Sequence, residues 1–214
     1  MTRYKKGRDL KRWKTPRLEA DSGKLRIIGG QYGGRQIEYS GDPVTRPMKD
    51  DVREALFNLV GGWTPGKAAF DLFAGSGAIG LEALSRGATQ AFFIERHFPT
   101  AKIIRENIES LDPHMNSTVA PSDSFFWTRR FFKNQSAWPT EPWIVFLCPP
   151  YEMFVTRTTD LLEMISCFKD SAPSESIIVV ESDDRFDVDQ LPNSKDWSIR
   201  QYSPALISIF KKFE

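Results

Sequence analysis

The chain has 214 residues, of which 40% are hydrophobic and 27% charged, with a formal net charge of +1. This length suits one hydrophobic core, and the composition excludes collagen-like, coiled-coil and wholly disordered proteins. The sequence contains no run of about 18 apolar residues, the length needed to span a membrane. Its two cysteines and two histidines predict neither a disulfide framework nor a metal site, so we expect a reduced, cytoplasmic protein.

The first segment of the chain is strongly basic. Residues 1–26 hold ten basic and three acidic side chains, a local charge of +7 that leaves −6 for the remainder. Because it is also poor in apolar residues, we predict that residues 1–24 form a disordered leader. Attraction to a polyanion and simple solubilisation explain this charge equally well.

Residues 25–62 are predicted to form a small N-terminal unit. Two β-like runs, 25–29 and 34–38, flank a glycine-containing turn and predict a hairpin. Apolar residues then recur from Val52 to Val60 at helical spacing, which predicts an amphipathic helix that ends at Gly61.

Strand and helix patterns alternate within the third predicted unit, residues 63–214. The predicted strands span 68–73, 90–95, 118–120, 143–147 and 176–181, and the predicted helices span 78–86, 100–111, 122–132 and 158–168. Apolar runs that alternate with amphipathic helices imply an α/β fold, with a parallel sheet covered on both faces. The segments 197–202 and 206–211 predict instead a C-terminal antiparallel hairpin.

A glycine-rich turn joins the first of these strands to its helix. Residues 75–80, GSGAIG, match the G-x-G-x-x-G pattern, which is typical of dinucleotide sites but also fits a tight structural turn. Asp71 lies four residues before the first glycine, where its carboxylate would repel a pyrophosphate. The same charge would favour the ammonium and sulfonium groups of S-adenosylmethionine, so the site favours a methyl donor over a nicotinamide cofactor.

The predicted donor site extends to the ends of the next two strands. Glu95 is placed to accept hydrogen bonds from ribose hydroxyls. Asp123 could accept from an adenine amine, with Ser124 beside it, and is equally suited to capping the following helix. The whole predicted set is Asp71, Phe73, Ala74, Gly75, Ser76, Gly77, Glu95, Arg96, Asp123 and Ser124.

The tetrapeptide Cys148-Pro149-Pro150-Tyr151 follows the fourth strand, at the sheet edge where open α/β folds bind ligands. Its prolines remove two backbone donors and fix the chain, leaving carbonyls as rigid acceptors. Tyr151 adds a ring for stacking, so the segment suits a planar base that carries an exocyclic amine. Without the glycine loop, a simple proline turn would explain it.

Three stretches resemble the bacterial 16S ribosomal RNA guanine-N2 methyltransferases: LRIIGGQYGGR (25–35), RPMKDDVREALF (46–57) and DLFAGSGAIGLEALSRGA (71–88). The resemblance covers about residues 25–211. It implies a Rossmann-like class I methyltransferase with a seven-stranded, mostly parallel sheet, which methylates a guanine amine in small-subunit RNA. The catalytic segment would be Cys148, Pro149, Pro150 and Tyr151. From their charge, the expected substrate contacts are Arg35, Arg46, Lys49 and Arg53. The last three could face RNA phosphate or the carboxylate of the donor, although the hairpin and helix arginines also fit solvated faces.

One position departs from that family, which has Asp or Asn where this chain has Cys148. A thiol is a weaker acceptor than a carboxylate or amide oxygen. Three interpretations follow: an active enzyme that relies on backbone acceptors, a changed target such as adenine N6 in DNA or another RNA amine, or a donor-binding, RNA-binding protein of reduced activity. The expected partner is ribosomal RNA or the small ribosomal subunit, rather than DNA or a membrane.

Overall fold

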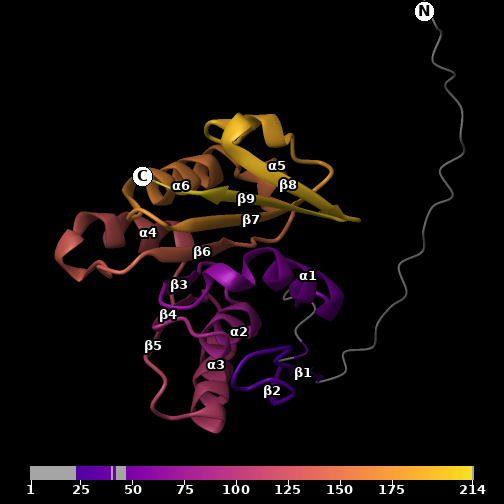
Figure 1. Cartoon of the computed structure of the whole chain (residues 1–214), viewed down its shortest axis with the longest axis vertical. Coiled ribbons are helices and arrows are strands. Elements are labelled where there is room, and N and C mark those ends of the chain that lie inside the picture. The colour runs from indigo at the N-terminus through magenta and orange to yellow at the C-terminus, as the bar shows by residue number, and fades with distance from the viewer. Residues whose placement is uncertain (1–22, 40, 42–46, 214) are drawn as a thin grey trace, which may run out of the picture.

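The structure is a computed structural model that describes residues 23–39, 41 and 47–213 (Figure 1). The predicted leader therefore lies outside the described residues except for Gly23 and Lys24, and Lys24 already begins strand β1 (Lys24–Arg26). Arg46 also lies outside them. No helix in the described part of the chain is long and apolar enough to cross a membrane.

Seven strands form one sheet in the order β5-β4-β3-β6-β7-β9-β8. Neighbours from β5 to β7 pair in parallel, whereas β9 runs antiparallel to both β7 and β8. The predicted mostly parallel sheet with a C-terminal antiparallel hairpin is confirmed. The strands are β3 (Ala68–Asp71), β4 (Gln90–Ile94), β5 (Ser117–Ala120), β6 (Trp143–Leu147), β7 (Ile177–Asp183), β8 (Trp197–Tyr202) and β9 (Ala205–Lys211).

Helices cover both faces of this sheet (Figure 1). One face is covered by α1 (Asp50–Val60), α2 (Ala78–Ser85) and α3 (Phe98–Leu111), and the other by α4 (Ser124–Lys133) and α6 (Thr158–Ser171). A short helix that the sequence patterns did not predict, α5 (Met153–Thr156), follows the Cys-Pro-Pro-Tyr segment. Single 3-10 turns occur at Gly61–Trp63, Gln135–Ala137, Val188–Gln190 and Ser194–Asp196.

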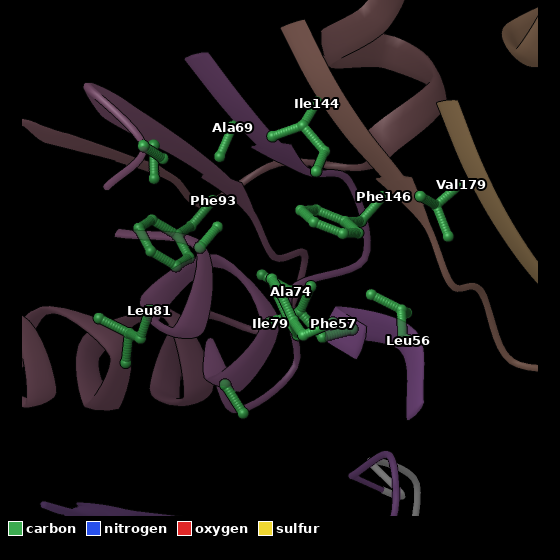
Figure 2. Close-up of a cluster of buried hydrophobic side chains, with 14 of the residues drawn as sticks. Leu56, Phe57, Ala69, Ala74, Ile79, Leu81, Phe93, Ile144, Phe146 and Val179 are labelled. Carbon is green, nitrogen blue, oxygen red and sulfur yellow. The ribbon is translucent and has the colours of Figure 1, made fainter. Parts of the chain in front are cut away.

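Strand residues alternate between two hydrophobic cores, because successive side chains point to opposite faces. On the α1–α3 face, Phe93, Phe146 and Val179 pack with Leu56 and Phe57 of α1 (Figure 2). The opposite core is rich in aromatic rings; those of Phe70, Trp143 and Phe168 lie within 5.3–6.2 Å of one another. Burial on both faces explains why β3, β6 and the first four residues of β7 are mostly apolar.

The order of the strands fixes where a ligand can bind. The chain runs outward from β3 to β4 and β5, then returns to β6 on the other side of β3. The carboxyl ends of β3 and β6 therefore flank the point at which the direction of winding reverses. Open α/β sheets bind their ligands in the crevice at this point.

The N-terminal hairpin is attached to the helix that follows the glycine loop. Its strands β1 and β2 (Gln36–Glu38) pair antiparallel. The buried carboxylate of Glu82, in α2, accepts hydrogen bonds from the backbone N–H groups of Ile28 (2.6 Å) and Gly29 (2.8 Å). It also forms a 2.7 Å ion pair with Arg86. The hairpin is thus held against α2 by a buried carboxylate, both of whose oxygens accept charge-assisted hydrogen bonds.

Candidate methyl-donor and base-binding site

Two predicted segments meet at the carboxyl edge of the sheet, at the reversal of winding. Asp71 ends β3 and pairs in register with Phe146 of β6, so the glycine loop and the Cys-Pro-Pro-Tyr segment leave adjacent strands side by side. Glu95 directly follows β4, on the other side of β3. Residues far apart in sequence therefore form one site because the sheet aligns their strand ends.

The glycine loop has the backbone geometry that its motif requires. Gly75 and Gly77 have φ values of 51° and 78°, in the left-handed region that favours glycine. Gly80 allows α2 to approach the sheet, since a Cβ there would lie 2.3 Å from Cε1 of Phe93. The Gly75 N–H donates to Oε2 of Glu95 at 2.9 Å. The loop is therefore held open by glycine conformations and tied to the end of β4.

Asp71 is buried beneath this loop. One carboxylate oxygen accepts from the Gly80 N–H at 3.0 Å, while Oδ1 has no hydrogen-bond partner among the described residues. Burial raises the pKa of Asp71 to about 7, against the lowering effect of the Gly80 hydrogen bond. A buried carboxylate with an unused oxygen is unfavourable, and a nearby cation would stabilise its ionised form. Asp71 thus fits a cationic methyl donor and disfavours a pyrophosphate.

Glu95 is half-buried, and both of its oxygens accept backbone hydrogen bonds. Oε2 binds the Gly75 N–H, and Oε1 binds the His97 N–H at 2.7 Å. A carboxylate has about four lone-pair sites, so each oxygen keeps capacity for a ribose hydroxyl. These bonds fix the orientation of the carboxylate, which is what a bidentate acceptor needs. Arg96, the next residue, is exposed.

Asp123 and Ser124 have structural contacts. The Asp123 side chain accepts from the Phe126 N–H at 3.0 Å and caps α4, the alternative that the sequence left open for this residue. Its other oxygen lies 3.8 Å from a guanidinium nitrogen of Arg157. The buried Ser124 hydroxyl donates to the Leu72 carbonyl. Asp123 lies half-buried at the same edge of the sheet, so its contact with adenine stays a prediction.

The Cys-Pro-Pro-Tyr segment is the second half of the candidate site. Pro149 is buried and Pro150 exposed, and the Pro150 carbonyl accepts from the Met153 N–H at 2.8 Å as α5 begins. That carbonyl is therefore partly used, and it keeps a second lone pair that could accept from a ligand. The Tyr151 hydroxyl donates to Oε1 of Glu181 at 2.6 Å, which fixes the direction of its ring.

Glu181, near the end of β7, is a candidate site residue that the sequence analysis did not identify. It is 8% exposed. Burial, with the Glu181 and Asp71 carboxylates nearby, raises the pKa of Cys148 well above its usual range, so Cys148 is a neutral thiol. Burial likewise raises the pKa of Glu181. The sequence did contain a signal for this residue, because Glu181 is a carboxylate that directly follows the apolar run Ile-Ile-Val-Val, in the strand after the tetrapeptide.

The predicted substrate contacts differ in their placement. Arg35 is exposed and donates to the Ser110 carbonyl at 3.1 Å, and Lys49 is exposed just before α1. Arg53 is fully buried; it donates to the Arg26 carbonyl at 2.7 Å and pairs with Asp50 at 2.9 Å. Arg53 therefore joins the hairpin to α1, and its guanidinium is not presented to a substrate.

The sheet has the strand order of a class I S-adenosylmethionine-dependent methyltransferase. The buried carboxylate beneath the glycine loop and the second carboxylate after the next strand fit the same class. Comparison with known proteins agrees. A family model described as "Conserved hypothetical protein 95" matches residues 25–211. The chain is 35% identical over 185 residues to "Ribosomal RNA small subunit methyltransferase D" of Escherichia coli (strain K12), covering 86% of each chain.

Two further relatives support the same assignment. "Putative rRNA methyltransferase YlbH" of Bacillus subtilis (strain 168) is 28% identical over 189 residues, which cover 88% of this chain and 99% of the relative. The solved structure "Putative methyltransferase yhhF from Escherichia coli" is 30% identical with a TM-score of 0.68, covering 89% of this chain and 99% of that one. The chain belongs to the conserved hypothetical protein 95 family, a family of rRNA methyltransferases.

Proposed function

We propose that this protein transfers a methyl group from S-adenosylmethionine to the exocyclic N2 amine of a guanine in small-subunit ribosomal RNA. The observation that carries the proposal is the juxtaposition of two half-sites on neighbouring strands. Asp71, at the end of β3, suits a cationic donor, and Tyr151, just beyond β6, offers a fixed ring for a base. A methyl donor and a planar acceptor would meet between them.

In this reaction the main task of the protein would be to align the methyl donor with the target amine. S-adenosylmethionine supplies an electrophilic methyl group; the carbon–sulfur bond breaks as the carbon–nitrogen bond forms, and the amine loses one proton. Asp71 and Glu95 would hold the donor, and Tyr151 would stack on a base that has been turned out of its helix. Holding both partners in line can contribute several kcal/mol of the barrier reduction, on the order of 7–11 kcal/mol in favourable cases.

Several features support an RNA substrate. Two relatives are named for activity on ribosomal RNA, one of them on the small subunit. The exposed Arg35 and Lys49 could meet phosphates, and the basic residues 1–24 would add affinity that weakens with salt. The choice of guanine N2 rests on the resemblance of residues 25–35, 46–57 and 71–88 to that class of enzyme. With this substrate, the protein would act in the cytoplasm.

A methyl-transfer assay tests the proposal. The full-length protein is incubated with methyl-labelled S-adenosylmethionine and one of three acceptors: small-subunit particles from cells that lack the protein, naked small-subunit RNA, or duplex DNA. Nucleoside mass spectrometry then identifies the product. We expect N2-methylguanosine in RNA. Label in DNA alone, label on another base, or donor binding by calorimetry without turnover on any acceptor would each refute the proposal.

Matched aromatic variants separate the site from general effects. Tyr151→Ala removes the proposed stacking ring, and we expect a loss of rate of about 10-fold or more, since a base–aromatic stack contributes about 1–3 kcal/mol. Phe213→Ala removes a ring that is 67% exposed and lies beyond β9, away from the carboxyl edge of β3 and β6. Full activity of Phe213→Ala would show that loss of a surface ring is not itself harmful.

A further inference from the structure

The register of the sheet places Cys148 and Glu181 side by side. β6 and β7 pair in parallel, and Leu147, the last residue of β6, lies opposite Val180. Cys148, directly after β6, and Glu181, the next residue of β7, therefore follow side by side. Phe146 and Val179, two residues earlier, both enter the core beneath α1. Since side chains alternate between faces, Cys148 and Glu181 project from that same face. The thiol and the carboxylate are therefore neighbours at the carboxyl edge.

Glu181 differs from Asp183, the other carboxylate of β7, in having no cationic partner. Asp183, two residues further along β7, is paired with Arg185 at 2.7 Å. Glu181 forms no ion pair with any arginine or lysine in the described ranges 23–39, 41 and 47–213. Its known contacts are the Tyr151 hydroxyl on Oε1, at 2.6 Å, and the thiol of Cys148. A buried carboxylate without a cation is costly to the fold, which points to a functional role.

Glu181 lies where it could replace the side-chain acceptor that is missing at Cys148. A thiol in place of a carboxylate or amide leaves the target amine without its side-chain acceptor. The Tyr151 ring is held at its hydroxyl end by Glu181. A base stacked on this ring and extending past the hydroxyl would bring its edge toward the carboxylate. The Cys148 thiol, which stays protonated, is suited to donate to the same carboxylate and help to orient it.

We propose that Glu181 is a catalytic residue whose carboxylate accepts the proton of the target amine, in the place of the side-chain oxygen that Cys148 lacks. This inference rests on the proposed function. As the methyl carbon leaves sulfur and bonds to the amine nitrogen, an N–H bond breaks and its proton passes to Glu181. The proton is released to water when the products leave, so the carboxylate returns to its starting state.

Three variants test this role by single-turnover rates at saturating donor and RNA acceptor. Glu181→Gln keeps the size of the side chain and removes its basicity, and we expect a rate on the order of 100-fold lower. Tyr151→Phe keeps the ring and removes only the hydroxyl contact, so it should lose much less. Asp184→Asn removes an exposed carboxylate three residues away, and should retain the wild-type rate.

The pH profile and a rescue separate catalysis from support of the fold. The wild-type rate should fall at acid pH as Glu181 becomes protonated, and Glu181→Gln should lack this limb. Adding Cys148→Asp to Glu181→Gln should restore activity at least about 10-fold, because it returns an acceptor to the adjacent strand. In Glu181→Gln, donor affinity by calorimetry should be close to wild type, and the melting temperature should be no lower than that of wild type.

The possible failures are distinguishable. If Glu181→Gln retains a rate within about three-fold of wild type, or is no worse than Tyr151→Phe, Glu181 only positions the ring and the inference is wrong. The proposed function would survive that result. If the wild-type protein transfers no methyl group to any nucleic acid, the proposed function fails and the inference fails with it.

Discussion

Asp71 at the end of β3 accepts a hydrogen bond from the backbone N–H of Gly80 at 3.0 Å, across the whole glycine loop. The bond ties the strand to the first turn of α2 and leaves the second carboxylate oxygen without a partner among the described residues. Burial raises the pKa of Asp71 from an ordinary 3.8 to about 7. Between these values the folded protein holds a proton that the unfolded chain has lost, so stability falls as the pH rises.

The first prediction concerns this stability. For the donor-free protein, we expect Asp71 alone to lower the free energy of unfolding by up to about 4 kcal/mol between pH 4 and pH 8. Asp71→Asn should remove that part of the slope, because an amide does not titrate. Urea unfolding at four pH values measures the slope, with Asp184→Asn as the exposed control. Equal slopes in wild type and Asp71→Asn would show that Asp71 is ionised in the folded state.

The second prediction is that donor binding releases a proton. A cationic donor favours the ionised form of Asp71, so its affinity should increase about 10-fold from pH 6 to pH 8. Calorimetry in two buffers with different ionisation enthalpies measures the proton directly. The Asp71→Asn variant should bind more weakly and without this pH dependence. A wild-type affinity that is constant over the range would contradict the role of Asp71.

The third prediction concerns Glu95. Glu95→Gln weakens the charge-assisted hydrogen bonds that the carboxylate accepts from Gly75 and His97, and those proposed from the ribose. We expect about 10-fold weaker donor binding, as typical hydrogen bonds to charged groups contribute about 1.5–3 kcal/mol. Glu106→Gln is a matched control on the surface of α3, where Glu106 pairs with Lys102 at 3.4 Å. The interpretation of Glu95 fails if both variants bind the donor equally well.

The fourth prediction compares two glycines of the N-terminal hairpin. Gly30 and Gly34 have φ values of +77° and +82°, so alanine at either should cost about 1–2 kcal/mol in backbone strain. A Cβ at Gly30 would also lie 1.9 Å from the Ser85 carbonyl oxygen of α2, whereas nothing lies within 4 Å at Gly34. Gly30→Ala should therefore destabilise the protein more. Urea unfolding measures both, and a smaller loss in Gly30→Ala would contradict the docking of the hairpin on α2.

The fold was largely predictable because its main elements repeat a simple pattern. Apolar strands such as 143–147 alternate with amphipathic helices such as 100–111, and the structure confirms both; β6 has the predicted bounds, and α3 begins two residues earlier, at Phe98. The four-residue helix α5 was not predicted, because its short sequence has no periodicity to detect. Its start depends on Pro150, whose carbonyl accepts from Met153.

The site was predictable where its chemistry lies within one continuous motif. The glycine loop and the Cys-Pro-Pro-Tyr segment could be identified from the sequence without knowing how the strands pair. Glu181 joins the site only through the pairing of β6 with β7, which no local pattern specifies. Arg53 is the converse case: its charge suggested a ligand contact, but partners from β1 and from the first turn of α1 bury it. Charged residues in helices can be assigned only when their tertiary partners are known.

The most direct test of the central claim is nucleoside mass spectrometry of small-subunit ribosomal RNA from cells that lack this protein. The RNA should lack one N2-methylguanosine that wild-type cells contain, and expression of the full chain should restore it. Expression of Tyr151→Ala at the same level should restore much less. Unchanged N2-methylguanosine in the deletion strain, or loss of a different modified nucleoside, would contradict the account.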